Sequence, residues 1–424
     1  MKRELKAAGL VTLLLIAAAV AAIFVHEREP AIAATTLQAG TDQINRGAYL
    51  ALAANCAGCH TAAGGAAYAG GRELRTPFGT FVTPNITPDA THGIGQWDTR
   101  DFWRALHHGK GRDGRPLYPA FPYTEYTQVS RDDADAIFAY LRSLPAVAKS
   151  NAPDRLRFPY SERSLLYVWR VLYFEPRTFT PDPAQSTEWN RGAYLVRGPG
   201  HCNACHTTRN ALGAAGGAAL GGGQVAGRSW YAPSLTAAHE AGRGQRSIDD
   251  TVQLLSTGIT RESAASGPMA EVIARSLQHL TAADWRAIAI YLQSLAEPAV
   301  APAVSITAEQ QARIDEAARK AAPLYEKHCA DCHGKSGEGA PGAYPALAGN
   351  RGVTMPSPLN GIRSVLDGGY TPATLRNPRP YGMPPFSHSL SSEEIALLVT
   401  YIRNSWGNRA SPVSAVQVER IVGD

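Results

Sequence analysis

Cys56-Ala-Gly-Cys59-His60 is a five-residue stretch of the pattern Cys-x-x-Cys-His, which occurs three times in the chain. The other copies are Cys202-Asn-Ala-Cys205-His206 and Cys329-Ala-Asp-Cys332-His333. Two cysteines with this spacing lie on one helical turn and can form thioethers with the two vinyl groups of a haem, while the histidine that follows ligates the iron. The sequence therefore predicts three covalently bound haem c groups.

A zinc knuckle and a redox dithiol are the alternative interpretations, because both use a Cys-x-x-Cys pair. The sequence contains 6 cysteines, and all of them belong to the three motifs. Each pair is followed at once by histidine, no second pair is left to complete a site of four cysteines, and no thiol is left over. The cysteine count therefore favours haem attachment.

Composition limits the number of domains and the classes of partner. At 424 residues and 44% hydrophobic content the chain is long enough for roughly three domains. High contents of glycine (40) and proline (29) fit compact domains with long loops around a large cofactor. A net charge of +5, evenly spread, gives no support to a nucleic-acid partner.

Residues 7–25 form an uncharged apolar run that follows three basic residues, Lys2, Arg3 and Lys6. The run is just long enough to span a bilayer, which favours a retained anchor over a cleaved signal. The alternative is cleavage at Ala31-Ile-Ala33. Basic residues on the short leading segment place the rest of the chain on the periplasmic side of the inner membrane. Residues 1–34 are therefore expected to be a membrane anchor, or a signal, with a linker.

The chain carries an internal repeat. Asn-Arg-Gly-Ala-Tyr-Leu occurs at residues 45–50 and 190–195, each time before a motif. Apolar residues at helical spacing follow each motif, at residues 136–144, 287–295 and 397–406. These helices are introduced by polar residues, Ser130, Thr281 and Ser391.

This pattern predicts a mainly α fold of three tandem class I cytochrome c domains with an N-terminal transmembrane helix. The predicted ranges are residues 40–187 for the first domain with an extra aromatic helix, 188–297 for the second, 306–410 for the third and 411–424 for a tail. The extra helix, at residues 161–174, is expected either to pack between domains or to form a docking surface for another subunit.

The chain resembles the trihaem cytochrome c subunit of bacterial membrane-bound dehydrogenases. The repeated hexapeptide carries the resemblance together with Thr83-Pro-Asn-Ile-Thr87, Leu117-Tyr-Pro-Ala-Phe-Pro-Tyr123 and Tyr401-Ile-Arg-Asn-Ser-Trp-Gly407. It covers nearly all of residues 40–410. It implies a separate catalytic subunit with quinoprotein, flavin or molybdenum chemistry, from which this subunit passes electrons to ubiquinone or a terminal oxidase.

Two other functions compete with this interpretation. A multihaem enzyme, such as a peroxidase or a thiosulfate-oxidising cytochrome, would need an iron with an open or displaceable sixth position, whereas a relay needs both faces closed. A cytochrome subunit of a terminal oxidase is the third possibility. No Rossmann glycine pattern, P-loop or Ser-His-Asp constellation suggests substrate chemistry of the chain's own.

Methionine is the commonest partner of histidine on the second face of a cytochrome c iron. Met269 and Met383 follow His206 and His333 in loops before the last helices, so we expect them to ligate the second and third haems. Met355 is closer to its motif and is expected to be a packing residue.

Each proximal imidazole also needs an acceptor for its other ring N–H. In cytochromes c a proline carbonyl in the loop after the motif supplies it. The candidates in this chain are Pro84, Pro233 and Pro345.

The first site departs from the other two. Phe121 holds the position corresponding to Met269, and no methionine occurs between His60 and His206. We expect the first haem to be five-coordinate or to take a ligand from elsewhere, with His107 and His108 as the nearest candidates. A methionine ligand raises the reduction potential of a haem, so the first haem, which lacks one, should have a lower reduction potential.

Overall fold

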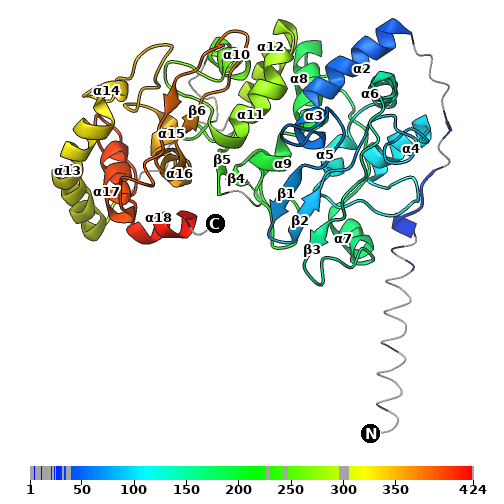
Figure 1. Ribbon diagram of the computed structural model, residues 1–424, viewed down its shortest axis with the longest axis horizontal. Coiled ribbons are helices and arrows are strands. Elements are labelled where there is room, and N and C mark those ends of the chain that lie inside the picture. Colours follow the sequence, from blue (N-terminus) through cyan, green and yellow to red (C-terminus); the bar gives the residue numbers. More distant parts are fainter. Residues whose placement is uncertain are drawn as a thin grey trace.

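The structure is a computed structural model that describes residues 40–225, 227, 229–241, 247–295 and 305–422, with residues 4, 11, 21, 23, 25–30 and 33–34. Helices dominate and the few strands are short, which confirms the mainly α class (Figure 1). Within these residues, no helix is both long enough and apolar enough to cross a membrane. Most of the predicted anchor at residues 7–25 lies outside them.

The first unit contains the first motif. Its elements are α2 (Thr41–Ala53), α3 (Cys56–His60), β1 (Glu73–Thr76), β2 (Gly79–Val82), α4 (Thr99–Trp103), the π-helical turn η1 (Arg104–His108), α5 (Tyr123–Tyr126), α6 (Arg131–Ser143), β3 (Arg155–Leu156) and α7 (Leu165–Tyr173). The strands pair antiparallel in the order β1-β2-β3, with Glu73 opposite Val82 and Gly79 opposite Leu156. Helix α7 lies within the predicted aromatic helix.

The other two units repeat this plan of first helix, motif helix, loops and last helix. The second contains α8 (Thr187–Arg197), α9 (Asn203–His206), β4 (Gly223–Gln224), β5 (Tyr231–Ala232), α10 (Ile248–Thr257), α11 (Gly267–Arg275), the 3-10 turn η2 (Leu277–His279) and α12 (Ala282–Ser294). The third contains α13 (Ala308–His328), α14 (Ala330–His333), α15 (Arg351–Thr354), α16 (Leu359–Asp367), β6 (Gly369–Tyr370), β7 (Gly382–Met383), α17 (Ser392–Arg403) and α18 (Ala415–Val422).

The last helices begin where the sequence predicts. The side chains of Ser130, Thr281 and Ser391 each accept a hydrogen bond from the backbone N–H three residues on. Such a cap satisfies one of the N–H groups that the first turn of a helix leaves without a partner.

The repeated hexapeptide lies where the first and last helices of a unit cross. A Cβ atom on Gly47 of α2 would be 1.9 Å from the carbonyl oxygen of Ala136 in α6, and one on Gly192 of α8 would be 2.0 Å from that of Ala287 in α12. Only glycine permits so close an approach of two backbones. In the third unit, α13 has the fully buried small residues Ala317 and Ala321.

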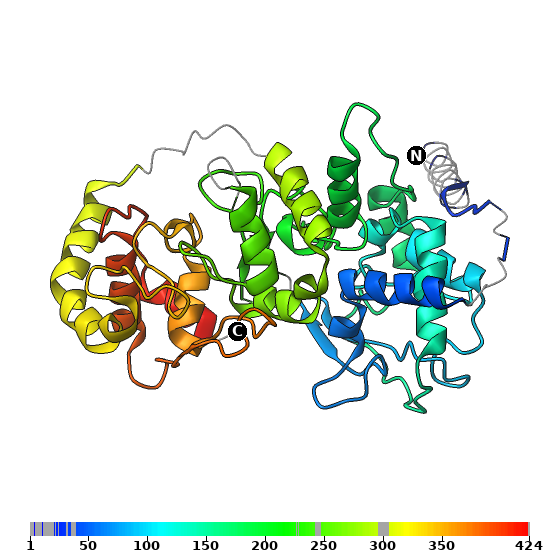
Figure 2. The ribbon, with the colours of Figure 1, turned by 90° about the horizontal axis from the view of Figure 1, so that it is seen from above.

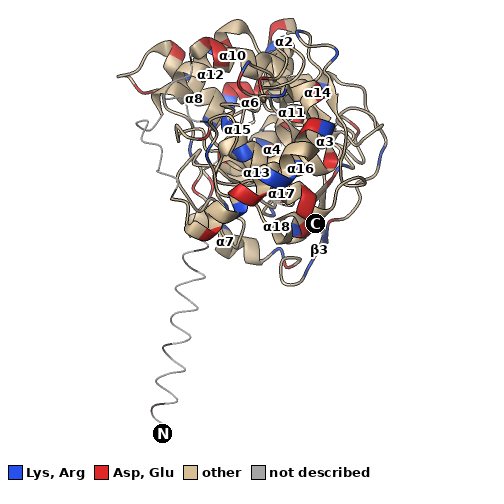
Figure 3. Cartoon of the chain, turned by 90° about the vertical axis from the view of Figure 1, so that its left-hand side faces the viewer, with Lys and Arg blue, Asp and Glu red and all other residues tan. Residues whose placement is uncertain are grey.

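The second unit lies between the other two (Figure 2). The third unit contacts it through paired hydrogen bonds of 2.8 Å, in which Asn360 of α16 accepts from the backbone N–H of Tyr231 and donates to its carbonyl. Arg363 donates to the carbonyl of Ser229 at 3.1 Å. The three motifs therefore follow one another in space as they do along the chain. Lys and Arg are interspersed with Asp and Glu on the face shown in Figure 3.

Candidate haem sites

The motif cysteines are free thiols that differ in exposure: Cys329 is buried, Cys205 is exposed and the other four are intermediate. All six lie in the described part of the chain and are unbridged. Burial, and then the neighbouring thiol, raise the pKa of Cys56 and of Cys202 to about 12, and that of Cys329 to about 11. Redox dithiols and zinc ligands require a thiolate, whose pKa is lowered rather than raised. In the described residues no group of three or more Cys, His, Asp or Glu side chains forms a metal site.

The motif histidines are anchored as the proximal ligands of a haem would be. Nδ1–H of His60 donates to the carbonyl of Pro84 at 2.8 Å. Burial lowers the pKa of the His60 imidazole, which is therefore neutral. A neutral ring that donates from Nδ1 presents the lone pair of Nε2, the atom that binds iron.

The same bond occurs at the other two sites. His206 donates to the carbonyl of Pro233 at 2.7 Å, and His333 to that of Pro345 at 3.0 Å. Burial lowers the pKa of both histidines. The three proline acceptors expected from the sequence are thus confirmed, although their loops differ in length.

The residue at the sixth-ligand position packs in the same apolar core as a motif cysteine in every unit. The expectation of a loop at Met269 was wrong, because Met269 lies in the first turn of α11, where it packs in the second core with Cys202. Met383, in β7, packs in the third core with Cys329. Their ligation of iron stays a prediction.

Phe121 holds this place in the first core, where it packs with Cys56 and Ala57. Its ring centroid is 5.4 Å from that of Tyr126, whose hydroxyl donates to the carbonyl of Ala54 at 2.8 Å. The equivalence of Phe121 with Met269, inferred from spacing, therefore has a structural counterpart. Met355 is buried, as expected of a packing residue.

His107 and His108 lie on the π-helical turn η1. Nδ1 of His107 donates to the carbonyl of Thr127 at 2.8 Å, and its ring stacks on Trp103 with 4.4 Å between centroids. His108 is buried beside Glu29 of the amino-terminal segment, and burial, followed by the charge of His107, lowers its pKa to about 4. His107 retains only Nε2 for an iron, and ligation by either residue stays a prediction.

The first two units pack reciprocally. The hydroxyl of Tyr49 in α2 donates to Asp284 of α12 at 2.6 Å, and the hydroxyl of Tyr194 in α8 donates to Asp133 of α6. Both tyrosines belong to the repeated hexapeptide. Such an exchange of equivalent contacts is typical of a two-fold interface, here formed within one chain.

Two arginines extend this exchange to the motifs. Arg72 donates to the carbonyl of Gly58, between the first pair of cysteines, and forms a two-pronged ion pair with Glu271 of α11. In the opposite direction Arg209 donates to the carbonyl of Ala204 at 3.0 Å and lies 3.9 Å from Glu125 of α5. Each arginine thus links one motif to the helix at the sixth-ligand position of the other unit, because α11 contains Met269 and α5 begins two residues after Phe121.

Cavities adjoin the second and third motifs. One of about 480 Å³ includes Asn203 of the second motif and is lined by Leu220, Tyr291 and the arginines Arg177 and Arg197. Another, of about 320 Å³, includes Ala330 of the third motif and both Tyr325 and Tyr401. Both linings mix polar with apolar side chains, and neither includes His206 or His333.

Comparison with known proteins also indicates cytochrome c domains. Residues 44–145 and 318–406 match the family model of cytochrome c. The chain is 39% identical over 403 residues to the cytochrome c subunit of the alcohol dehydrogenase (quinone) of Gluconacetobacter polyoxogenes, covering 92% of this chain and 86% of that protein. It is 35% identical over 449 residues to the fructose dehydrogenase cytochrome subunit of Gluconobacter japonicus, covering 99% and 89%.

A diheme cytochrome c-type protein of Cereibacter sphaeroides is 39% identical over 261 residues, which cover 60% of this chain and 86% of that protein. The chain belongs to the family of cytochrome c subunits of membrane dehydrogenases. This confirms the resemblance seen in the sequence, and cytochrome c domains imply covalently bound haem c.

Sequence reasoning missed the residues that join the two cytochrome units. Arg72 and Glu271 lie 199 positions apart, so no local pattern connects them. It also missed His201, which precedes the second motif and packs edge-on against Tyr126 of the first unit with 5.2 Å between ring centroids. Arg209 lies only three residues after His206, so its proximity in sequence was a local sign that it contacts the second motif.

Proposed function

We propose that this cytochrome c subunit carries three haem c groups and relays electrons from a dehydrogenase catalytic subunit to ubiquinone or a terminal oxidase. The observation that carries the proposal is the threefold recurrence of one site. Each copy combines a Cys-x-x-Cys-His helix, a histidine bonded through Nδ1 to a proline carbonyl, and a core that joins a cysteine to the sixth-ligand position.

The side chains have distinct roles in this proposal. The cysteines Cys56, Cys59, Cys202, Cys205, Cys329 and Cys332 attach the haems, and His60, His206 and His333 bind iron. Met269 and Met383 close the second face of two haems. Haem supplies the one-electron chemistry, and the protein sets its potential through ligands and burial.

The first site has a different ligand set, because Phe121 offers no donor atom. A haem without a methionine ligand should have a lower reduction potential than the other two haems. Electrons would then enter at the first site and leave through the second, which lies between the first and third units.

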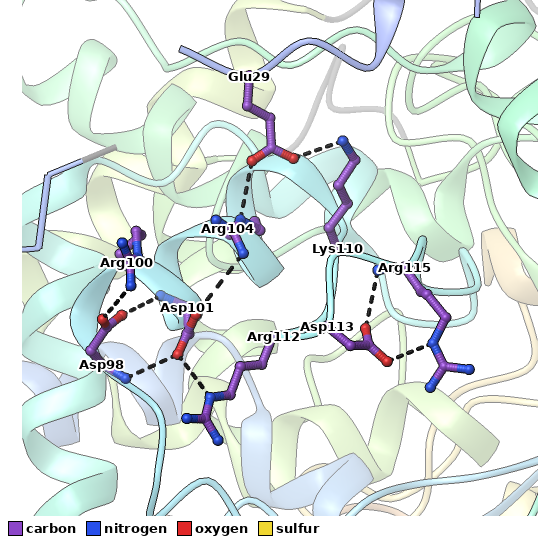
Figure 4. Close-up of polar contacts among 9 residues, drawn as sticks. All are labelled: Glu29, Asp98, Arg100, Asp101, Arg104, Lys110, Arg112, Asp113 and Arg115. Carbon is purple, nitrogen blue, oxygen red and sulfur yellow. Dashed lines mark hydrogen bonds and ion pairs between the residues drawn. The ribbon is translucent and has the colours of Figure 1, made fainter. Parts of the chain in front are cut away.

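The retained amino-terminal anchor is also a proposal, and contacts of the adjoining segment support it. Lys110, whose side chain is 8% exposed, binds Glu27 at 2.8 Å and Glu29 at 2.7 Å. Arg104 binds Glu29 at 3.1 Å (Figure 4). Cleavage after Ala33 would remove both carboxylates and leave Lys110 buried without them, which is costly. With this anchor retained, the basic residues Lys2, Arg3 and Lys6 ahead of it favour a periplasmic position for the rest of the chain.

Co-purification tests the partner. A tagged chain is extracted from membranes with mild detergent, the large subunit is identified by mass spectrometry, and that subunit's substrate is added. We expect the c-type α band to gain intensity as the haems are reduced, and added ubiquinone to reoxidise them. The partner's type, whether quinoprotein, flavin or molybdenum, follows from its cofactor.

Two results would contradict the proposal. A chain that purifies alone and oxidises a small substrate such as peroxide or thiosulfate by itself would be a multihaem enzyme. Reduction by the partner without reoxidation by ubiquinone or by an oxidase would reject the relay.

A further inference from the structure

Helix α7 presents an apolar stripe to the surface. Leu165, Val168 and Leu172 are 50%, 47% and 61% exposed and recur at helical spacing. Apolar residues spaced in this way share one face of a helix. A soluble surface helix normally turns such a face inward.

Neighbouring side chains enlarge the stripe into a patch. Phe158 is 82% exposed, and Tyr160 and Tyr173 are more than a third exposed. Trp169 of α7 donates from its indole nitrogen to the carbonyl of Leu212 at 2.9 Å. Leu212, an exposed leucine of the second unit, therefore lies next to α7. A contiguous exposed apolar surface marks an interaction site.

The opposite face of α7 holds the amino-terminal segment. The Arg170 side chain is 2% exposed and binds the carboxylate of Glu27 at 2.7 Å and the carbonyl of His108 at 2.7 Å. Glu27 is two residues beyond Val25, where the apolar run of residues 7–25 ends. Helix α7 is therefore attached directly to the end of that run, and it lies beside the described part of this segment in Figure 1.

This attachment limits how far the patch can lie from the membrane. If residues 7–25 cross the bilayer, Glu27 lies at the edge of the hydrocarbon core. A helix is about 10–12 Å across with its side chains, and the headgroup layer is roughly 5–8 Å thick on each side. The stripe, on the far side of α7 from Glu27, therefore lies within about one helix diameter of the membrane surface.

We propose that the patch formed by Phe158, Tyr160, Leu165, Val168, Leu172 and Tyr173 lies in the interfacial region of the lipid bilayer. The proposal rests on the membrane attachment inferred above. Aromatic residues with a polar edge favour this region, and an amphipathic helix can lie in its plane with its apolar face in the lipid. The membrane would then hold this cytochrome subunit at two points, which orients the three sites relative to the bilayer.

Depth measurement by spin labelling tests the proposal. Full-length haem-loaded Val168→Cys is labelled with a nitroxide and inserted into nanodiscs of phosphatidylethanolamine and phosphatidylglycerol without any other subunit. Collision rates with oxygen, which concentrates in lipid, are compared with those of a water-soluble nickel chelate. Asn45→Cys is the control, because Asn45 is exposed on α2 of the same unit. Helix α2 lies at the opposite side of that unit from α7 in Figure 1.

The label at Val168 should collide at least several-fold more with oxygen, relative to nickel, than the label at Asn45. Equal ratios in protein that co-migrates with the discs would overturn the α7 proposal and leave the anchor standing. Protein that does not enter the discs would overturn both. Shielding of Val168 that arises only after the catalytic subunit is added would assign the patch to that subunit instead of lipid.

Discussion

At the scale of single residues, one side chain distinguishes the first site from the other two. Phe121→Met should create a His/Met site, because Phe121 packs in the first core as Met269 does in the second. We expect near-infrared magnetic circular dichroism to show the methionine-to-iron charge-transfer signal for two haems in the native protein and three in the variant, with a raised potential at the first.

Phe121→Leu is the matched control and should add no signal. Three such signals in the native protein would show that another methionine reaches the first haem. Rapid binding of carbon monoxide or cyanide at one native haem would indicate a vacant sixth position, and its absence would favour His107 or His108.

Glu27 gives a pH-dependent prediction. Burial raises its pKa, but the hydrogen bonds and charges of Arg170 and Lys110 outweigh burial, and the pKa is lowered from 4.5. A lowered pKa stabilises the folded state above pH 4.5, and this contribution is lost as the pH falls through the folded value. Glu27→Gln should therefore lower the thermal midpoint at pH 7, and lower it by less at pH 3. A loss that is equal at both pH values would mean that the Glu27 charge is not the cause.

Several residue-level features could be predicted from the sequence because the chemistry of one motif dictates them. A Cys-x-x-Cys-His helix requires an acceptor for the histidine N–H, so a proline in the following loop was a sufficient clue for Pro84, Pro233 and Pro345. The carboxylates around Lys110 were not predictable, since Glu27 and Glu29 are about 80 residues away in the chain.

At the scale of elements, the crossing of α2 and α6 depends on Gly47. Gly47→Ala would place a methyl group 1.9 Å from a backbone oxygen, so the helices must separate. We expect a cost of about 1–3 kcal/mol in unfolding free energy, measured by urea denaturation. Gly361→Ala in α16 is the control, because its methyl group would meet only a Val399 side chain at 3.8 Å. It should be neutral or slightly stabilising, and a similar loss in both variants would reject the close crossing.

Helix α11 carries both Met269 and Glu271, so the Arg72 ion pair is expected to hold this helix against the first motif. A double-mutant cycle of Arg72→Gln and Glu271→Gln should give a coupling energy of about 1 kcal/mol. The single variants should also weaken the methionine-to-iron signal of the second haem. If the two substitutions have additive effects on stability, or if the methionine-to-iron signal is unchanged, the pair is an ordinary surface ion pair that does not position α11. Arg209→Gln, at the longer 3.9 Å pair, should have the smaller effect.

The helices themselves were predictable, because capping residues and apolar spacing are local signals. The predicted starts at Ser130, Thr281 and Ser391 are the observed caps. The exposure of the apolar face of α7 was not predictable. Periodicity shows that a helix has an apolar face, but it does not show what covers that face. The sequence therefore left two roles open for this helix.

At the scale of the whole molecule, the arrangement of the units came only from the structure. The internal repeat indicated that the first two units are related. The exchange between Tyr49 and Asp284, and between Tyr194 and Asp133, shows that they also pack reciprocally. Such contacts depend on pairs far apart in sequence, and one chain without an alignment offers no signal for them. The same holds for the bonds of Asn360 to Tyr231.

Counting the haems tests the central claim most directly. Intact-mass spectrometry of the purified native protein should show the chain mass plus three haem groups. Each of three double variants, Cys56→Ala/Cys59→Ala, Cys202→Ala/Cys205→Ala and Cys329→Ala/Cys332→Ala, should lose one haem and one third of the pyridine haemochrome absorbance. A native mass with two haems, or a double variant that keeps the full native content, would contradict the account.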